Sequence, residues 1–319
     1  VEEQMIMKKT TLNILATLGI LSAAYAQEWQ YTTSEGGYSY DENGIYTDSK
    51  GFTVFESNTW DGLDWSGKNS GVDAKDSSGR NPVKYPGSLA FSALTIVEST
   101  IKNSDFSNST YFGNSNYSSL STLLVNNDAT LENVDFSGSS FSHKAENPSG
   151  YEFVALYLLG TVKNANFSNV EISETSSAGF GIRFGGLAGG TNVIENINLS
   201  SAKITMTNST VGVGIDFKRD VKNINIDNIE INSSNGFALY SMWNVIDGLS
   251  AKDAKFTVRE DLPYVWADSE RNTFKATDFR GTTVNGRLFS AEDISSTGTN
   301  INTLLGNGEI FSNDNGSSV

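Results

Sequence analysis

The charged residues of segment 214–220 are the ones whose types and spacing could do chemistry. Asp216 and Lys218 are two residues apart in an apolar-polar alternation, so a strand would place both on one face. Arg183 lies one repeat earlier. A polysaccharide lyase needs a Lys or Arg base near acidic residues that can hold calcium. These three residues are therefore candidates for catalysis, but a solvated surface cluster is the more ordinary interpretation, and we assign no catalytic residue from the sequence.

Other catalytic and metal-binding signals are weak. The chain has no cysteine and one histidine, His143, which we expect in an inserted loop. A zinc or other soft-metal site is therefore not expected, and we predict no metal and no cofactor. Segment 312–316 is similar to a calcium loop but lacks its acidic spacing and terminal Glu.

The charge of the chain limits its partners. The formal net charge is −15 at neutral pH. Such a surface repels phosphate backbones and anionic lipids, so we expect neither nucleic acid nor an anionic membrane as a partner. No apolar stretch of membrane length follows the N-terminal region, and we expect no membrane insertion.

A repeated pattern sets the elements that would position these residues. Each copy has an aliphatic or Phe residue, then usually Asn two places on, Asp or Asn four places on, and an apolar anchor five places on. A second apolar residue follows five places after the anchor. The clear copies are 101–106, 131–136, 162–167, 194–199 and 221–226, and the looser ones are 246–251 and 274–279. The copies recur roughly every 25 to 32 residues, and self-similarity at such a period indicates a solenoid.

The pattern within each copy favours strands over helices. Apolar and polar residues alternate, as in 223–232, which is the period of a strand with one face buried. A second apolar run precedes each copy, and Gly, Asn and Ser occupy the intervening corners. Each repeat therefore has the size and composition of one coil of a parallel β-helix.

Stacking of coils predicts two columns of like residues. One is an interior column of core anchors, and the other is a side-chain amide ladder at a corner. The anchors are Phe106, Phe136, Phe167, Leu199, Ile226 and Phe279. The ladder residues are Asn103, Asn133, Asn164, Asn196 and Asn223, and Gly248 is expected to interrupt the ladder.

With these features the chain resembles right-handed parallel β-helix repeat proteins, including the passenger and adhesin regions of bacterial autotransporters. Segment 134–143 also has a five-residue rhythm similar to pentapeptide repeats. The resemblance covers residues 86–311. It implies an all-β, right-handed parallel β-helix of about eight coils with an N-terminal cap.

The N-terminal segment of the chain suggests export. Lys8 and Lys9, the apolar run 12–21 and a small-residue site ending at Ala26 predict a secretory signal peptide. Met7 is the expected start. The predicted organisation is a signal peptide over 1–26, a cap over 27–58, a β-helix over 59–311 with an inserted loop 68–87, and a polar, truncated tail over 312–319.

Insertions after the second apolar position would form one loop face. We expect loops at 143–150 and 173–181, so binding is expected around His143, Tyr151, Ser173 and Gly179. An aromatic strip of Tyr157, Trp243, Tyr264 and Trp266 is a weaker candidate for sugar binding. The leading hypothesis is a secreted or surface scaffold that binds a glycan or a host or cell surface. The alternatives are a polysaccharide lyase and a structural envelope protein without a ligand.

Overall fold

The computed structural model describes most of the predicted repeat region. The described residues are 45–47, 53–74, 92–115, 121–144, 152–186, 191–241, 244–260, 265–267, 273–290, 293–294, 300–301, 304–306 and 310–311. The predicted signal peptide, most of the predicted cap, Tyr151, Trp243, Tyr264 and the tail 312–319 lie outside them.

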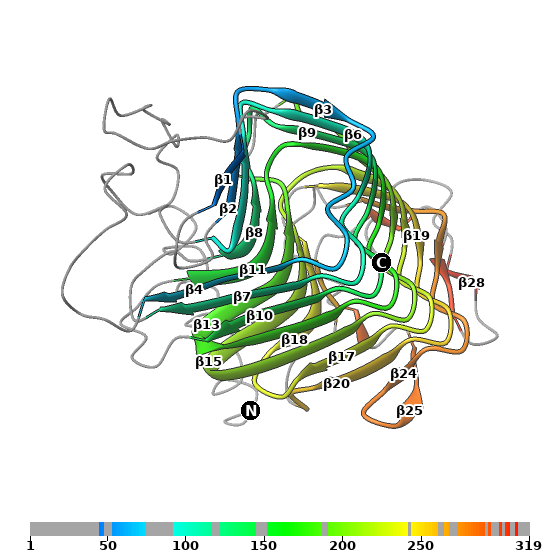
Figure 1. Cartoon of the computed structure of the whole chain (residues 1–319). Helices are drawn as coiled ribbons and strands as arrows, with labels where there is room; N and C mark the ends of the chain where they lie inside the picture. The colour runs from blue at the N-terminus through cyan, green and yellow to red at the C-terminus, as the bar shows by residue number, and fades with distance from the viewer. Residues whose placement is uncertain are drawn as a thin grey trace.

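The chain forms an all-β parallel solenoid of about six regular turns, in which strands of successive coils lie side by side (Figure 1). The all-β parallel solenoid predicted from the repeat is therefore confirmed. The sequence count of about eight coils also includes two irregular ones. One is the looser copy 274–279 and the other is a degenerate first coil at 60–65, where Trp60 and Trp65 take the apolar positions of the pattern; the strands at Trp60 and Phe274 are only three residues long.

One sheet of 12 strands carries the repeated pattern. Its strands are β3 (Thr59–Asp61), β6 (Thr100–Asp105), β9 (Thr130–Asp135), β12 (Thr161–Asn166), β14 (Ile194–Asn198), β16 (Val221–Asn225), β19 (Val245–Ser250), β22 (Thr273–Lys275), β23 (Thr277–Asp278), β26 (Asn300–Ile301), β27 (Leu304–Leu305) and β28 (Ile310–Phe311).

A second sheet, of 16 strands, has two arms. One arm contains β1 (Ile45–Thr47), β2 (Thr53–Glu56), β5 (Leu94–Val97), β8 (Ser121–Val125), β11 (Glu152–Leu158), β18 (Phe237–Ser241) and β21 (Val265–Ala267). The other contains β4 (Asn69–Ala74), β7 (Thr110–Ser115), β10 (Ser140–Lys144), β17 (Glu230–Ser233), β20 (Lys255–Val258), β24 (Thr283–Val284) and β25 (Arg287–Leu288). The long strands β13 (Glu171–Phe184) and β15 (Lys203–Phe217) run through both arms (Figure 1).

The interior is built from columns of equivalent residues. The rings of Phe106 and Phe136 stack with centroids 5.0 Å apart, and those of Phe136 and Phe167 stack at 4.9 Å. Leu199, Ile226 and Phe279 are buried in the same core. Alternation along each strand sends one apolar residue inward per two residues, and the coil repeat places it on its counterpart.

An amide ladder follows one corner of the repeat sheet. Each ladder Asn has a positive φ, between 48° and 58°, which Asn tolerates better than most residues. Each Nδ2 donates to the Oδ1 of the preceding coil at 2.8–2.9 Å, and the first bond of the series ends on Asp61. At the next position Gly248 has a φ of 78° and no side chain to continue the series.

A second ladder, which the sequence analysis did not identify, runs two residues further along. Asn166, Asn198 and Asn225 each donate Nδ2 to the equivalent Oδ1 of the coil before, beginning at Asp135, at 3.0–3.2 Å. The same Oδ1 atoms accept the backbone N–H two residues on, for example that of Ser168. This turn explains why the repeat has Asp or Asn at this position.

Two predicted loops contain strands. Residues 69–74, expected inside the loop 68–87, form β4, which pairs with β7. Residues 173–181, expected as a loop, belong to the long strand β13. On one side β13 pairs with β10 and β11 of the preceding coil, and on the other side it pairs with β15. The Ser- and Gly-rich composition favours a loop, but here glycines lie within a strand at positions where an added side chain would meet Glu174, at Gly179, or Ile204, at Gly181.

Both ends of the described solenoid change to antiparallel pairing. β1 pairs with β2 at the N-terminal side, and β24 pairs with β25 and β27 with β28 at the C-terminal side. Antiparallel pairs of this kind occupy sheet edges that would otherwise present unpaired backbone groups.

Candidate functional site

The candidate residues Arg183 and Asp216 are brought together on adjacent strands. They are register partners on β13 and β15, and Arg183 Nε donates to Asp216 Oδ2 at 2.6 Å. Lys218 Nζ lies 3.9 Å from Asp216 Oδ1. The sequence therefore grouped these three residues correctly in space.

The three residues lie on the outer side of the sheet. Side chains added at Gly181 and Gly214 would meet Ile204 and Ile231, so these positions face the interior. Phe180 and Arg183 point the other way, and the guanidinium carbon lies 3.8 Å from the centroid of the Phe180 ring. The apolar residues beside the pair form a second cluster separate from the main core; its members are Val154, Phe180, Val211, Val213, Phe237 and Tyr240, with Tyr157 packed against them.

The expectation of a solvated surface cluster is wrong. Asp216 is 0% exposed, Arg183 4% and Lys218 9%. Phe180 covers Arg183, and Lys218 Nζ lies 4.8 Å from the centroid of the Tyr240 ring. A carboxylate held by two cations under aromatic rings is a buried ion network, and Asp216 cannot reach a polymer in solvent.

His143 is also in a different setting from the one expected. It lies on β10, not in a loop, and its Nδ1 is 3.3 Å from Glu174 Oε1 on β13, with both side chains fully buried. The imidazole stacks on Phe153 at 4.9 Å. A side chain at Gly179 would overlap Glu174 Oε2, so the glycine makes room for this pair. Ser173 lies instead on the exposed side of β13.

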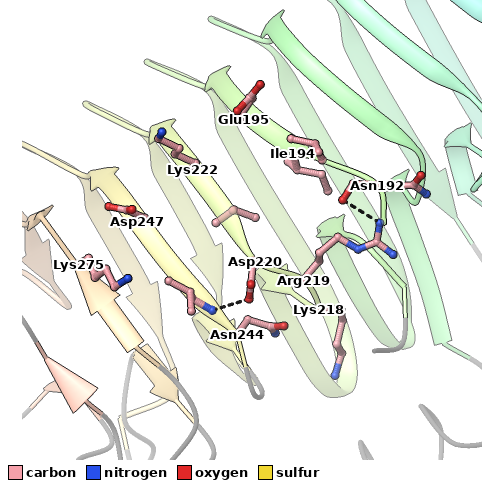
Figure 2. Close-up of a pocket in the computed structure, with 13 residues that line it drawn as sticks. Asn192, Ile194, Glu195, Lys218, Arg219, Asp220, Lys222, Asn244, Asp247 and Lys275 are labelled. Atoms are coloured by element: carbon pink, nitrogen blue, oxygen red, sulfur yellow. Dashed lines mark hydrogen bonds between the residues drawn. The ribbon is translucent and has the colours of Figure 1, made fainter. Parts of the chain in front are cut away.

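The open feature near these residues is a groove of about 640 Å³ at the start of the repeat-sheet strands. Figure 2 shows its walls, which come from four successive coils at the beginnings of β14, β16, β19 and β22. The lining residues are Asn192, Val193, Ile194, Glu195, Lys218, Arg219, Asp220, Val221, Lys222, Asn244, Val245, Asp247 and Lys275.

The unequal length of the connections between strands explains the hollow. The connection 185–193, between β13 and β14, is longer than 218–220 and 242–244, which occupy the same place in the next two coils. Asn192 fixes its end, because Nδ2 donates to Asn127 O at 2.8 Å and to Leu159 O at 3.0 Å. The end of the long connection, at Asn192 and Val193, forms one wall of the groove, and Arg219, Asp220 and Asn244 of the two shorter connections line it further along the stack.

Arg219 is the half-buried cation of the groove. Its Nη1 donates to the backbone oxygen of Asn192 at 3.2 Å, and Figure 2 shows it reaching toward Asn192 while Lys218 extends the other way. Burial lowers the pKa of the Arg219 guanidinium, and the charge of Asp220 acts in the opposite direction. Asp220 Oδ1 itself accepts the backbone N–H of Val245 at 2.8 Å.

A column of alternating charge crosses the groove. Residues of successive coils are in direct register and alternate in sign without interruption; from first to last they are Asp61, Lys102, Glu132, Lys163, Glu195, Lys222, Asp247 and Lys275. The last seven directly follow the first apolar residue of each repeat. The sequence thus contained this signal, which the repeated apolar and Asn positions alone did not reveal.

The remaining predicted features are only partly described. Tyr157 is half-buried, with the Arg183 guanidinium 5.7 Å from its ring centroid, so it does not present an open aromatic face. The described residues contain no group of three or more His, Cys, Asp or Glu side chains placed to hold a metal ion. They also include no helix with the length and apolarity needed to cross a membrane.

Comparisons with known proteins give a weak likeness. No protein-family profile matches the chain, and no curated protein matches it. Among solved structures, two trypsin-treated variants of QnrB1, a plasmid-mediated fluoroquinolone resistance protein, are similar at 12% and 11% identity. The matches cover 77% and 76% of this chain and 91% of each of those chains, with a TM-score of 0.22. The architecture described above rests on the strand pairing of this chain itself.

Proposed function

We propose that this protein is an exported, non-enzymatic β-solenoid scaffold that works by contact with a glycan on a host or cell surface. The observation that carries the proposal is the burial of Arg183 and Asp216, since a polymer in solvent cannot reach these two catalytic candidates. The groove beside them is open. An open groove beside a buried ion network supports binding without turnover.

The groove also favours contact over cleavage through the use of its charges. Glu195 pairs with Lys163 at 3.3 Å, and Asp220 accepts a backbone N–H. Carboxylates engaged in this way stabilise the contacts between coils. A glycosidase instead needs two carboxylates that face the bond to be cleaved, and a lyase needs a base beside a cluster of acidic residues. The lyase remains the alternative, since the groove combines Lys218 and Arg219 with carboxylates.

The test is release of reducing or unsaturated ends from a panel of acidic glycans, with and without calcium. We expect no product from the mature chain and measurable retention of the chain on at least one glycan. Product that disappears in Lys218→Ala would replace the scaffold proposal with the lyase. Fusion of residues 1–26 to a periplasmic reporter tests export, and a reporter that stays in the cytoplasm would contradict that part of the proposal.

A further inference from the structure

We propose that the groove binds an acidic polysaccharide that carries one carboxylate per disaccharide, with Arg219, Lys222 and Lys275 as its anion-binding residues. This inference rests on the scaffold function proposed above and names the ligand class of that scaffold. It follows from the pairing of the cations, their spacing along the stack and the charge between them.

The pairing of the arginines singles out Arg219. Arg183, Arg280 and Arg287 each form an ion pair with an Asp. Arg219 forms none with any residue in the described part of the chain, and one backbone oxygen is its hydrogen-bond partner there. A guanidinium has five N–H donors in a fixed fork that matches a carboxylate. A half-buried fork with unused donors, at the wall of a groove, is a site for a ligand carboxylate.

The lysines of the charge column differ inside and outside the groove. Outside it, Lys102 and Lys163 contact the carboxylates of the next coil, each at 3.3 Å. Inside it, Lys222 and Lys275 form no ion pair with any described residue. Figure 2 shows Lys222, Asp247 and Lys275 in a row across three successive strands. The two groove lysines are therefore the ones whose charge a ligand can use.

The spacing of these lysines selects the ligand. Lys222 and Lys275 are two coils apart, which is roughly 10 Å at the strand spacing of a sheet. That separation is close to the length of a disaccharide. A chain with a carboxylate on alternate sugars can place one carboxylate at each lysine and an uncharged sugar over Asp247. A chain with a carboxylate on every sugar would place one against Asp247, which repels it.

The net charge of the protein favours a thin polymer over an acidic protein. At −15 the surface repels any broad acidic partner. A single polysaccharide chain brings few charges, and at physiological salt each is screened beyond about 8 Å. A volume of about 640 Å³ accommodates a short stretch of such a chain rather than a folded surface.

The experiment is titration of the purified mature chain with size-matched oligosaccharides of hyaluronan, which alternates uronate with an uncharged amino sugar, and of polygalacturonate, which is charged on every sugar. We expect hyaluronan to bind more tightly. Arg219→Gln should weaken that binding by at least about tenfold, because a charged hydrogen bond is lost. Lys222→Gln and Lys275→Gln should each weaken it about two- to fivefold.

A gain-of-binding variant and a control make the test independent of folding damage. Asp247→Asn should strengthen polygalacturonate binding about two- to fivefold, since a repulsive charge is removed. Lys102→Gln, in the same column but outside the groove, should leave hyaluronan binding unchanged. Thermal melts of all variants should match the parent protein.

Three results would overturn the inference: equal or tighter binding of polygalacturonate, unchanged hyaluronan binding in Arg219→Gln, or preferential binding of poly-glutamate. In the second case, retained glycan binding would leave the scaffold proposal standing and move the site elsewhere. If the parent protein bound no glycan and no cell surface, both the scaffold proposal and this inference would be overturned.

Discussion

Two regions of the solenoid share one interior but are stabilised differently. One is the corner, where the anchors Phe106, Phe136 and Phe167 stack inside and the amide ladder runs outside. The other is a polar lobe, formed by the buried pair His143 and Glu174. At the corner, phenylalanine recurs in three successive coils and its rings stack at 4.9–5.0 Å, and the next two coils place the apolar residues Leu199 and Ile226 in the same column. In the lobe, the residue type changes at every coil: in register, Gly113, His143, Glu174, Met206 and Ser233 follow one another.

The comparison shows how a solenoid separates structure that repeats from structure that occurs once. A column of like residues can be extended by adding coils, because each neighbour offers the same surface. The lobe cannot be extended in this way, since the His143–Glu174 pair needs one particular neighbour on each side. The corner should therefore resist substitution according to the volume lost, and the lobe according to which partner is removed.

The largest effect is expected at the corner. Phe167→Ala removes a ring packed between two coils and should lower the free energy of unfolding by about 3 to 5 kcal/mol through the transfer and cavity terms. Chemical denaturation of the mature chain measures it. Phe256→Ala, in the less regular C-terminal coils, should cost less. If Phe256→Ala were the more damaging, stacking would not be what stabilises the corner.

The next largest effect is expected in the lobe. Glu174→Met leaves the buried His143 without its carboxylate and should cost about 3 kcal/mol, as breaking a buried pair does. The double variant His143→Leu, Glu174→Met should recover most of that loss, because both polar groups are then gone. Met206 already occupies the next position of this column. A double variant as unstable as the single one would show that volume, not pairing, governs the lobe.

The sequence predicted the corner well because repetition itself carried the information. The anchors are buried in stacked positions, and the amide ladder runs through the five Asn residues identified from the repeat. In both cases one coil predicts the next. The register of the charge column was equally readable, but it became visible only when the residue after the first apolar position was followed from coil to coil.

The lobe and the groove could not be predicted in the same way. His143 and Glu174 are 31 residues apart and each occurs once in its column, so no pattern links them. The segment 173–181 has the composition of a loop, yet it is held as strand by pairing with β11 and β15. The groove depends on the relative lengths of three connections, which sequence shows only once the strand ends are known.

Gly179→Ala tests the same lobe by crowding it. The added methyl group would overlap Glu174 Oε2, so we expect a loss of about 2 kcal/mol from overpacking. The loss should be smaller when Gly179→Ala is made in a Glu174→Ala background, which opens the space. Thermal denaturation of the two single variants and the double variant gives the coupling energy. Additive effects would mean that the glycine serves the backbone and not the pair.

The smallest effect is expected on the exposed side of the corner, at Asn164. Asn164→Gly keeps a residue that accepts the φ of 52°, but it removes the bonds to Asn133 and from Asn196, so we expect a loss of about 1 kcal/mol. Asn164→Ala loses the same bonds and adds the cost of a left-handed backbone, for about 2 kcal/mol in total. Gly248 shows that the column accepts glycine at its end. Equal losses in the two variants would assign the preference for Asn to the ladder alone. A much larger loss in the alanine variant would assign it to backbone conformation, and the corner would then differ from the lobe in its backbone as well as its packing.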